Sequence, residues 1–343
     1  MSRQRLTVVL SQAQGRNPTR RALEESIAAA LIMEPGLDVS IVPYLYDLGP
    51  DHTGRLFLES IQGDMVVLAW MYPRATFWLL DRDGIKGQYG ENQITPPADT
   101  EEDEEDGKQE LPKGIGSVEV PERWIYCLDL RDHSNYEIYV QEVRRIALEC
   151  RERREAQLKT WIQGQPTMVQ LGRYLREDET PKPQPQFTAE QVLKQPDRRW
   201  YPVIDYSRCT NCMECLDFCL FGVYGVDKLD RILVENQDNC KRGCPACSRV
   251  CPEHAIMFPD YKTPAIAGAP VGSISGLKID LSKLFGGGDA LAIASQERDR
   301  ELVADGRQAV GMTVGIPKRQ ADKPKGAKDD LDKLMDALDD LEI

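Results

Sequence analysis

Eight of the ten cysteines lie between Cys209 and Cys251, in two runs of four. The first run has two, two and three residues between its cysteines, and the second has three, two and three. Closely spaced thiolates on one loop can hold three corners of an iron–sulfur cluster, while the fourth ligand comes from elsewhere in the chain. This pattern therefore constrains the fold of the stretch more than any other feature of the sequence.

A zinc site and a disulfide framework are the alternatives. Zinc sites usually show two separated ligand pairs, whereas each run here has four cysteines within about a dozen residues. Disulfides are disfavoured because nothing at the start of the chain resembles a signal peptide, so we expect a cytoplasmic protein with reduced thiols. The spacing favours iron–sulfur clusters.

Residues 200–262 resemble the bacterial two-[4Fe–4S] ferredoxin family in both cysteine runs and in the proline that follows Cys251. In that family the last cysteine of each run serves the other cluster. The resemblance therefore implies a small α+β domain that holds two [4Fe–4S] clusters. The first implied ligand set is Cys209, Cys212, Cys215 and Cys251. The second implied ligand set is Cys240, Cys244, Cys247 and Cys219.

Two departures from the family pattern bear on the second set. Leu220 follows Cys219 where the family usually has proline, and the first gap of the second run is one residue longer, filled by Lys241, Arg242 and Gly243. Gly243 can adopt the positive φ that a widened loop requires. The two added cations predict that the two clusters differ in reduction potential.

In residues 1–172, short apolar runs alternate with segments of helical periodicity. This alternation predicts a parallel α/β sheet of at least four strands. The expected strands are 6–10, 39–42, 65–70 and 124–128, and the expected helices are 20–33, 56–61 and 135–163. Asn17 and Pro18 predict the start of the first helix. Neither a GxGxxG nor a GxxxxGK[ST] motif is present, so no nucleotide site is predicted and this half is assigned to no family.

Other polar and sulfur side chains of this half carry weaker signals. His52 and His133 lie in expected loops near Asp51, Asp129 and Asp132, where they could bind a metal or transfer protons. Isolated loop histidines are more often solvated, so we predict no catalytic residue. The remaining two cysteines, Cys127 and Cys150, fit small buried side chains rather than iron ligands.

The net charge of −13 lies in two acidic segments, which contribute −7 over 99–106 and −6 over 329–343. The first belongs to an expected surface insertion at about 95–118, because like charges at that density repel one another. The rest of the chain is near neutral, so nucleic-acid binding is not expected. No apolar run approaches the length of a membrane-spanning helix.

Proline-rich and glycine-rich stretches predict disordered linkers at 173–199 and 263–328, the second with a helix near 289–305. Residues 329–343 form an expected acidic amphipathic helix, which would either dock in a groove of a partner or fray. Together these features predict an electron carrier that relays single electrons between redox partner proteins. The alternatives are a reductase or reductase subunit whose α/β half binds a substrate or organic cofactor, and clusters with a purely structural role.

Overall fold

The computed structural model of the chain describes residues 5–94, 114–165, 196–269 and 290–315. An α/β domain comes first, and its strands and helices are β1 (Leu6–Ser11), α1 (Pro18–Ile32), β2 (Leu37–Val42), η1 (Leu45–Asp47), α2 (Thr53–Ser60), β3 (Met65–Ala69), α3 (Pro73–Arg82), β4 (Gln88–Gly90), β5 (Trp124–Asp129) and α4 (Tyr136–Ile162). A second region follows, with β6 (Val203–Ile204), α7 (Glu214–Phe218), β7 (Tyr224–Val226), β8 (Ile232–Val234), η2 (Gln237–Asn239), α8 (Ala246–Val250), β9 (Ile256–Met257), α9 (Pro264–Ala267), α11 (Ala290–Ala304) and η4 (Gly311–Thr313).

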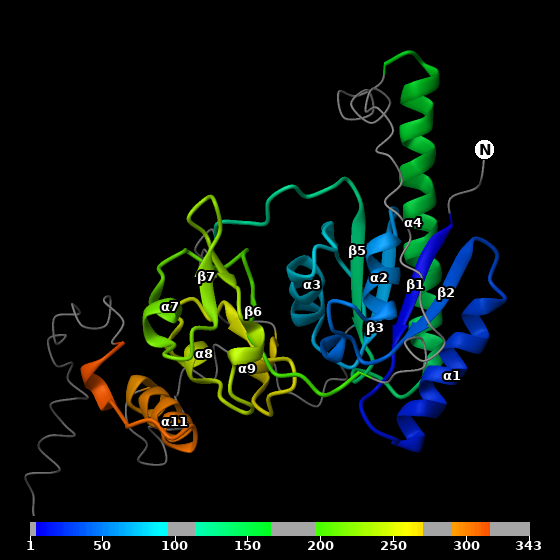
Figure 1. Cartoon of the computed structure of the whole chain (residues 1–343). Coiled ribbons are helices and arrows are strands. Elements are labelled where there is room, and N and C mark those ends of the chain that lie inside the picture. The colour runs from blue at the N-terminus through cyan, green and yellow to red at the C-terminus, as the bar shows by residue number, and fades with distance from the viewer. Residues whose placement is uncertain (1–4, 95–113, 166–195, 270–289, 316–343) are drawn as a thin grey trace, which may run out of the picture.

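The sheet of the α/β domain has five parallel strands in the order β2-β1-β3-β5-β4. Its central strand β3 is buried at every position, as expected for a parallel strand that helices cover on both faces. Figure 1 shows the sheet between its two helical layers. The predicted parallel α/β sheet is confirmed, with one strand more than the minimum expected.

The two faces of the sheet carry two separate apolar cores. On one face, Leu6, Val8, Val66 and Leu68 pack with apolar side chains of α1 and α4. On the other face, alternate residues of the same strands pack with α2 and α3. This alternation follows from the two-residue period of a strand.

Two asparagines begin the helices of the first face. The Asn17 side chain accepts hydrogen bonds from the amides of Thr19 and Arg20, and Pro18 occupies the first helical position of α1. The Asn135 side chain accepts from the amide of Glu137 at the start of α4. Both side chains satisfy amides that have no partner within the helix, so the predicted starts of these helices are confirmed within two residues.

The helix α3 is not among the helices expected from the sequence. The preceding strand β3 ends at Ala69, and Pro73 occupies the first turn of α3, where its missing N–H costs nothing. Every residue from Ala75 to Asp81 is buried. A helix buried all round lacks the polar face by which an amphipathic period is recognised.

The second region is small and built from short elements. Strands β6 and β9 pair antiparallel, and β7 and β8 form an antiparallel hairpin. The helices α7 and α8 have five residues each. This region holds both cysteine runs.

The second region shares an apolar core with the α/β domain. Tyr201, Val203 and Met257 belong to the same buried cluster as residues of α3 and β3. The rings of Tyr46 and Tyr201 lie 4.5 Å apart, and the Tyr46 hydroxyl bonds both the amide and the carbonyl of Tyr201. Arg74 on α3 forms a 2.5 Å ion pair with the buried Asp205. The two regions therefore pack as one body, side by side in Figure 1.

Several predictions fall outside the described residues: most of the acidic insertion (95–113), most of the first linker (173–195), residues 270–289 and the C-terminal helix at 329–343. The helix expected near 289–305 is α11. It packs on α8 of the second region, so residues 290–315 are part of the folded body rather than a linker. Among the described helices, none is long and apolar enough to cross a membrane.

Candidate iron–sulfur sites

The first cysteine run lies on a loop that curls tightly into α7. Asn211 and Met213 adopt positive φ angles of 59° and 63°, which turn the chain between successive cysteines. The Asn211 side chain donates to the carbonyl of Asp230 and accepts from the amide of Ile232, so the β7–β8 hairpin holds the loop in place. Cys215 lies on α7, and Cys219 ends this helix.

The second run repeats this plan with a wider loop. Gly243 has a φ of 88°, as predicted for the longer gap after Cys240. Cys247 lies on α8, and Cys251 ends that helix. Because α7 and α8 pack against each other, the last cysteine of each run lies close to the loop of the other.

Two cavities collect the eight cysteines in two groups of four. One cavity, here called the first site, is lined by Cys209, Cys212, Cys215 and Cys251. The other, here called the second site, is lined by Cys219, Cys240, Cys244 and Cys247. The structure thus brings together the two sets of residues that the ferredoxin resemblance implies. Their role as ligands stays a prediction.

The thiols of both sites lie in a desolvated environment. Burial raises the pKa of Cys209 to about 11 and that of Cys244 to about 12. Burial also raises the pKa of Cys219 and Cys251, while backbone amides of the residues that follow each cysteine favour its ionised form. A buried thiolate is stable only beside positive charge or hydrogen-bond donors, and bound iron supplies positive charge.

Hydrogen bonds also reach the sulfur atoms. The Tyr224 hydroxyl donates to the Cys247 sulfur at 3.1 Å, and the amide of Ala255 donates to the Cys251 sulfur at 3.3 Å. Four soft sulfur donors around each cavity, with a hydrogen-bond donor directed at one sulfur of each set, fit an iron–sulfur cluster. In the described part of the chain, no three histidine, cysteine or acidic side chains are placed to hold a single metal ion.

Aromatic and aliphatic side chains lie at both sites. Phe218, Phe221 and Tyr224 line the second site, and Ile256 lines the first. Phe258 is buried and stacks on Trp200 at 5.1 Å between ring centroids. Phe218, Phe221, Tyr224 and Ile256 thus form apolar parts of the cavity walls.

The other chemically active side chains lie elsewhere. Cys127 and Cys150 are buried in the cores of the α/β domain, and burial raises the pKa of Cys150 to about 11. The imidazole of His52 accepts from the amide of Gly54 at the start of α2. The backbone amide of His133 donates to the Tyr139 hydroxyl. The two histidines thus have local structural contacts in separate loops.

Sequence reasoning missed two contacts to the sites. The backbone of Gly114 and Ile115 pairs with that of Ser207 and Cys209, beside the first site. Arg298 on α11 lines the second site. Neither the glycine at position 114 nor the positive charge of Arg298 indicates a long-range contact. No pattern in the sequence would therefore have identified these two contacts.

A third cavity of about 280 Å³ lies between the α/β domain and the hairpin of the second region. Arg82, Lys86 and Arg231 line it together with Asp81 and Asp227. The two signs of charge largely balance there. The cavity therefore offers no clear preference for a charged ligand.

The fold and the sites define an α/β domain joined to a ferredoxin-like module. Part of the chain is similar to an uncharacterized ferredoxin of Methanocaldococcus jannaschii, with 44% identity over 79 residues. The match covers 23% of this chain and 53% of that protein, so the chain spans about half the length of the curated relative that it matches. No protein-family model matches the chain, and no solved structure matches it significantly. The similarity supports a ferredoxin-like module in part of the chain and suggests iron–sulfur clusters.

Proposed function

We propose that this chain is an electron-transfer protein that carries two [4Fe–4S] clusters and relays single electrons between redox partner proteins. The observation that carries the proposal is the sorting of eight cysteines into two cavities, each with three residues from one run and the last residue of the other. This exchange is the ligand arrangement of two-cluster ferredoxins. The similarity to a ferredoxin supports the same conclusion.

The first site would hold one cluster through Cys209, Cys212, Cys215 and Cys251. The second site would hold the other through Cys240, Cys244, Cys247 and Cys219. When bound, each cluster accepts and gives up one electron at a time. The protein fixes the ligands, keeps water away and sets the charge near each site.

The α/β domain would serve as a rigid support for this module. The shared core around Tyr46 and Tyr201 and the Arg74–Asp205 ion pair support that role, because they fix the module in one orientation. A fixed orientation would present the same cluster to the same partner in each transfer. We further infer a cytoplasmic location, where thiol ligands stay reduced.

Iron and sulfide analysis of anaerobically purified protein, combined with electron paramagnetic resonance, tests the proposal. We expect about eight irons per chain and, after reduction, the signals of two interacting S = 1/2 centres. Cys212→Ser and Cys247→Ser should each remove about half of the iron, because they affect different sites. Cys150→Ala, which changes a cysteine outside both sites, should leave the iron content unchanged. Iron-free protein, or full iron content in both serine variants, would refute the proposal.

A further inference from the structure

The helix α11 is attached to the second site by apolar and charged contacts. Leu291 and Ala294 of α11 are buried in one cluster with Phe218, Cys244 and neighbouring residues of α8. Arg249 on α8 forms two hydrogen bonds, of 2.8 and 3.0 Å, with the carboxylate of Glu297. Lys241 pairs with Asp305 at 2.7 Å. A helix 40 residues beyond the last cysteine therefore covers one of the two sites and not the other.

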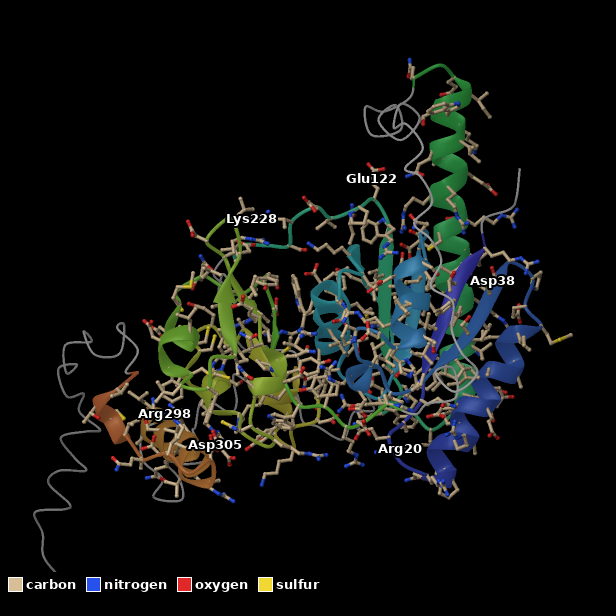
Figure 2. All side chains as sticks on the ribbon, in the orientation of Figure 1. Arg20, Asp38, Glu122, Lys228, Arg298 and Asp305 are labelled. Carbon is tan, nitrogen blue, oxygen red and sulfur yellow. The ribbon has the colours of Figure 1, made fainter. Side chains whose placement is uncertain are left out.

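Arg298 is the buried cation of this helix. Its side chain is 1% exposed and lines the second site. The guanidinium lies 4.5 Å from the centroid of the Phe218 ring and donates to the carbonyls of Gly311 and Val314 at 2.6 and 3.0 Å. These carbonyls orient the guanidinium without neutralising it. Figure 2 shows Arg298 on α11 and Asp305 directly after this helix, next to the module.

Acidic residues near Arg298 offset its positive charge at the second site only in part. Asp299 accepts from Arg298 at 3.3 Å but also from the amide of Gly311, and it does not line the cavity. Glu297 and Glu301 raise the pKa of Cys244, after burial and the Cys219 thiol, although Glu297 is paired with Arg249. Among the described residues, the charged side chains that line the second site are Arg298 and Lys241.

The first site has the opposite charge. Glu214, which is 2% exposed, lines it together with Glu253. No lysine or arginine of the described chain lines this cavity. Arg208 is buried nearby and donates to the carbonyl of Glu253; its charge also interacts with the Cys251 thiol, but it does not line the cavity. The two cavities thus place a carboxylate beside one set of cysteines and a guanidinium beside the other.

We propose that α11 is an intramolecular cap whose Arg298 makes the second site the more easily reduced of the two. The inference rests on the proposed function. Reduction is a one-electron step in which the external donor protein loses an electron and the loaded site gains one negative charge, with no bond made or broken. A buried cation stabilises that added charge, and a buried carboxylate disfavours it; neither is well screened by salt. With both sites loaded, an electron would therefore be held more tightly at the second site than at the first.

An anaerobic redox titration of the intact holoprotein, followed by electron paramagnetic resonance, tests this order. We expect the second site to be reduced at the higher potential. Arg298→Gln should lower the potential of that site by at least about 59 mV, which is a tenfold change in a one-electron equilibrium constant. The potential of the first site should stay unchanged. Arg298→Lys, which keeps the charge, should keep the order of the two potentials.

Arg300→Gln is the matched control, because Arg300 is an exposed arginine of the same helix. Arg300→Gln changes the net charge by the same amount, but it should change the one-electron equilibrium constant of the second site by less than about twofold. An unchanged potential in Arg298→Gln would overturn the proposal. A raised potential would overturn it as well. It would mean that water entering the second site after α11 has undocked stabilises the added charge better than Arg298 does.

A second variant covers failure of Arg298→Gln to assemble. Lys241→Gln removes the other cation of the second site, whose amine lies 5.5 Å from the centroid of the Phe221 ring. It should lower the potential of that site by a smaller amount, and an unchanged potential would count against the proposal. The iron content of the unmodified protein decides the proposed function separately, whatever the order of the two potentials.

Discussion

The α/β domain and the ferredoxin-like module are stabilised in different ways. The domain has a five-stranded sheet with an apolar core on each face, supplied by long helices. Within residues 200–262, the module has strands of two or three residues and α-helices of five, and eight cysteines occupy much of its interior. A core of that size rarely supports a fold without bound metal. The comparison sets a region with a large apolar core against one that, under the proposed function, would depend on its cofactor.

Removal of the iron should produce the largest effect. Anaerobic treatment with a strong chelator should abolish amide protection in residues 200–262, because ligand bonds replace most of the missing core. Strands β3 and β5 should keep their protection. Hydrogen exchange measured by mass spectrometry reports on both regions in one sample, and full protection of the module without iron would break the comparison.

The buried ion pair between the two regions gives the next effect. Asp205 is 1% exposed, so Arg74→Met would leave an unpaired buried carboxylate and lower the free energy of unfolding by about 3 kcal/mol. The matched control is Arg5→Met, which breaks the exposed Arg5–Asp38 pair and should cost less than about 1 kcal/mol. Denaturant unfolding of the holoprotein measures both. Equal effects would mean that the interface contributes no more than a surface pair.

Gly114→Ala tests the backbone pairing of Gly114 and Ile115 with Ser207 and Cys209 beside the first site. A Cβ atom at Gly114 would lie 2.4 Å from backbone atoms of Ser207, which cannot move as a side chain can. Overpacking of this kind costs about 1–3 kcal/mol, and we expect exchange protection to fall at Ile115 and Cys209. Gly49→Ala is the control, since the nearest atom to a Cβ there is 3.8 Å away. Unchanged protection in Gly114→Ala would show that the contact is dispensable.

The smallest effect concerns pH and belongs to the α/β domain alone. Burial and then repulsion from Asp129 raise the pKa of Asp132 to about 6, above the ordinary aspartate value of 3.8. The folded state therefore binds this proton more tightly, and the contribution to stability is lost as pH rises from about 4 to about 6. Asp132→Asn should stabilise the protein by about 1 kcal/mol at pH 7 after allowance for solvent. Denaturant unfolding at several pH values checks this, with the exposed Asp51→Asn as control. Equal pH profiles in both variants would contradict it.

The sequence predicted the features that depend on local patterns. Asn17 and Asn135 marked the starts of two helices, and the alternation of strands with helices predicted the parallel sheet. The grouping of cysteines that the family resemblance implied also matches the two cavities. Neighbouring residues carry the signal for the helix starts and the sheet, whereas the family resemblance carries it for the cysteine sets.

Features that depend on distant contacts were missed. The helix α3 lies between the sheet and the module, so it lacks a polar face, and the strand β4 has three residues and no apolar run. The position of α11 could not be predicted because Arg298 reads as a surface residue until Phe218, Gly311 and Val314 surround it. Burial of such a charge is decided by partners up to 80 residues away.

The contact of Gly114 and Ile115 with the loop of Cys209 has a consequence for dissection of the protein. This segment precedes β5 in the chain, so a cut between residues 165 and 196 would not separate the two regions. A nicked protein should stay together on a sizing column, and an isolated N-terminal fragment would expose Tyr46 and its apolar neighbours to solvent. Transfer of the module into another protein would require transfer of the α/β-domain surface on which the module packs.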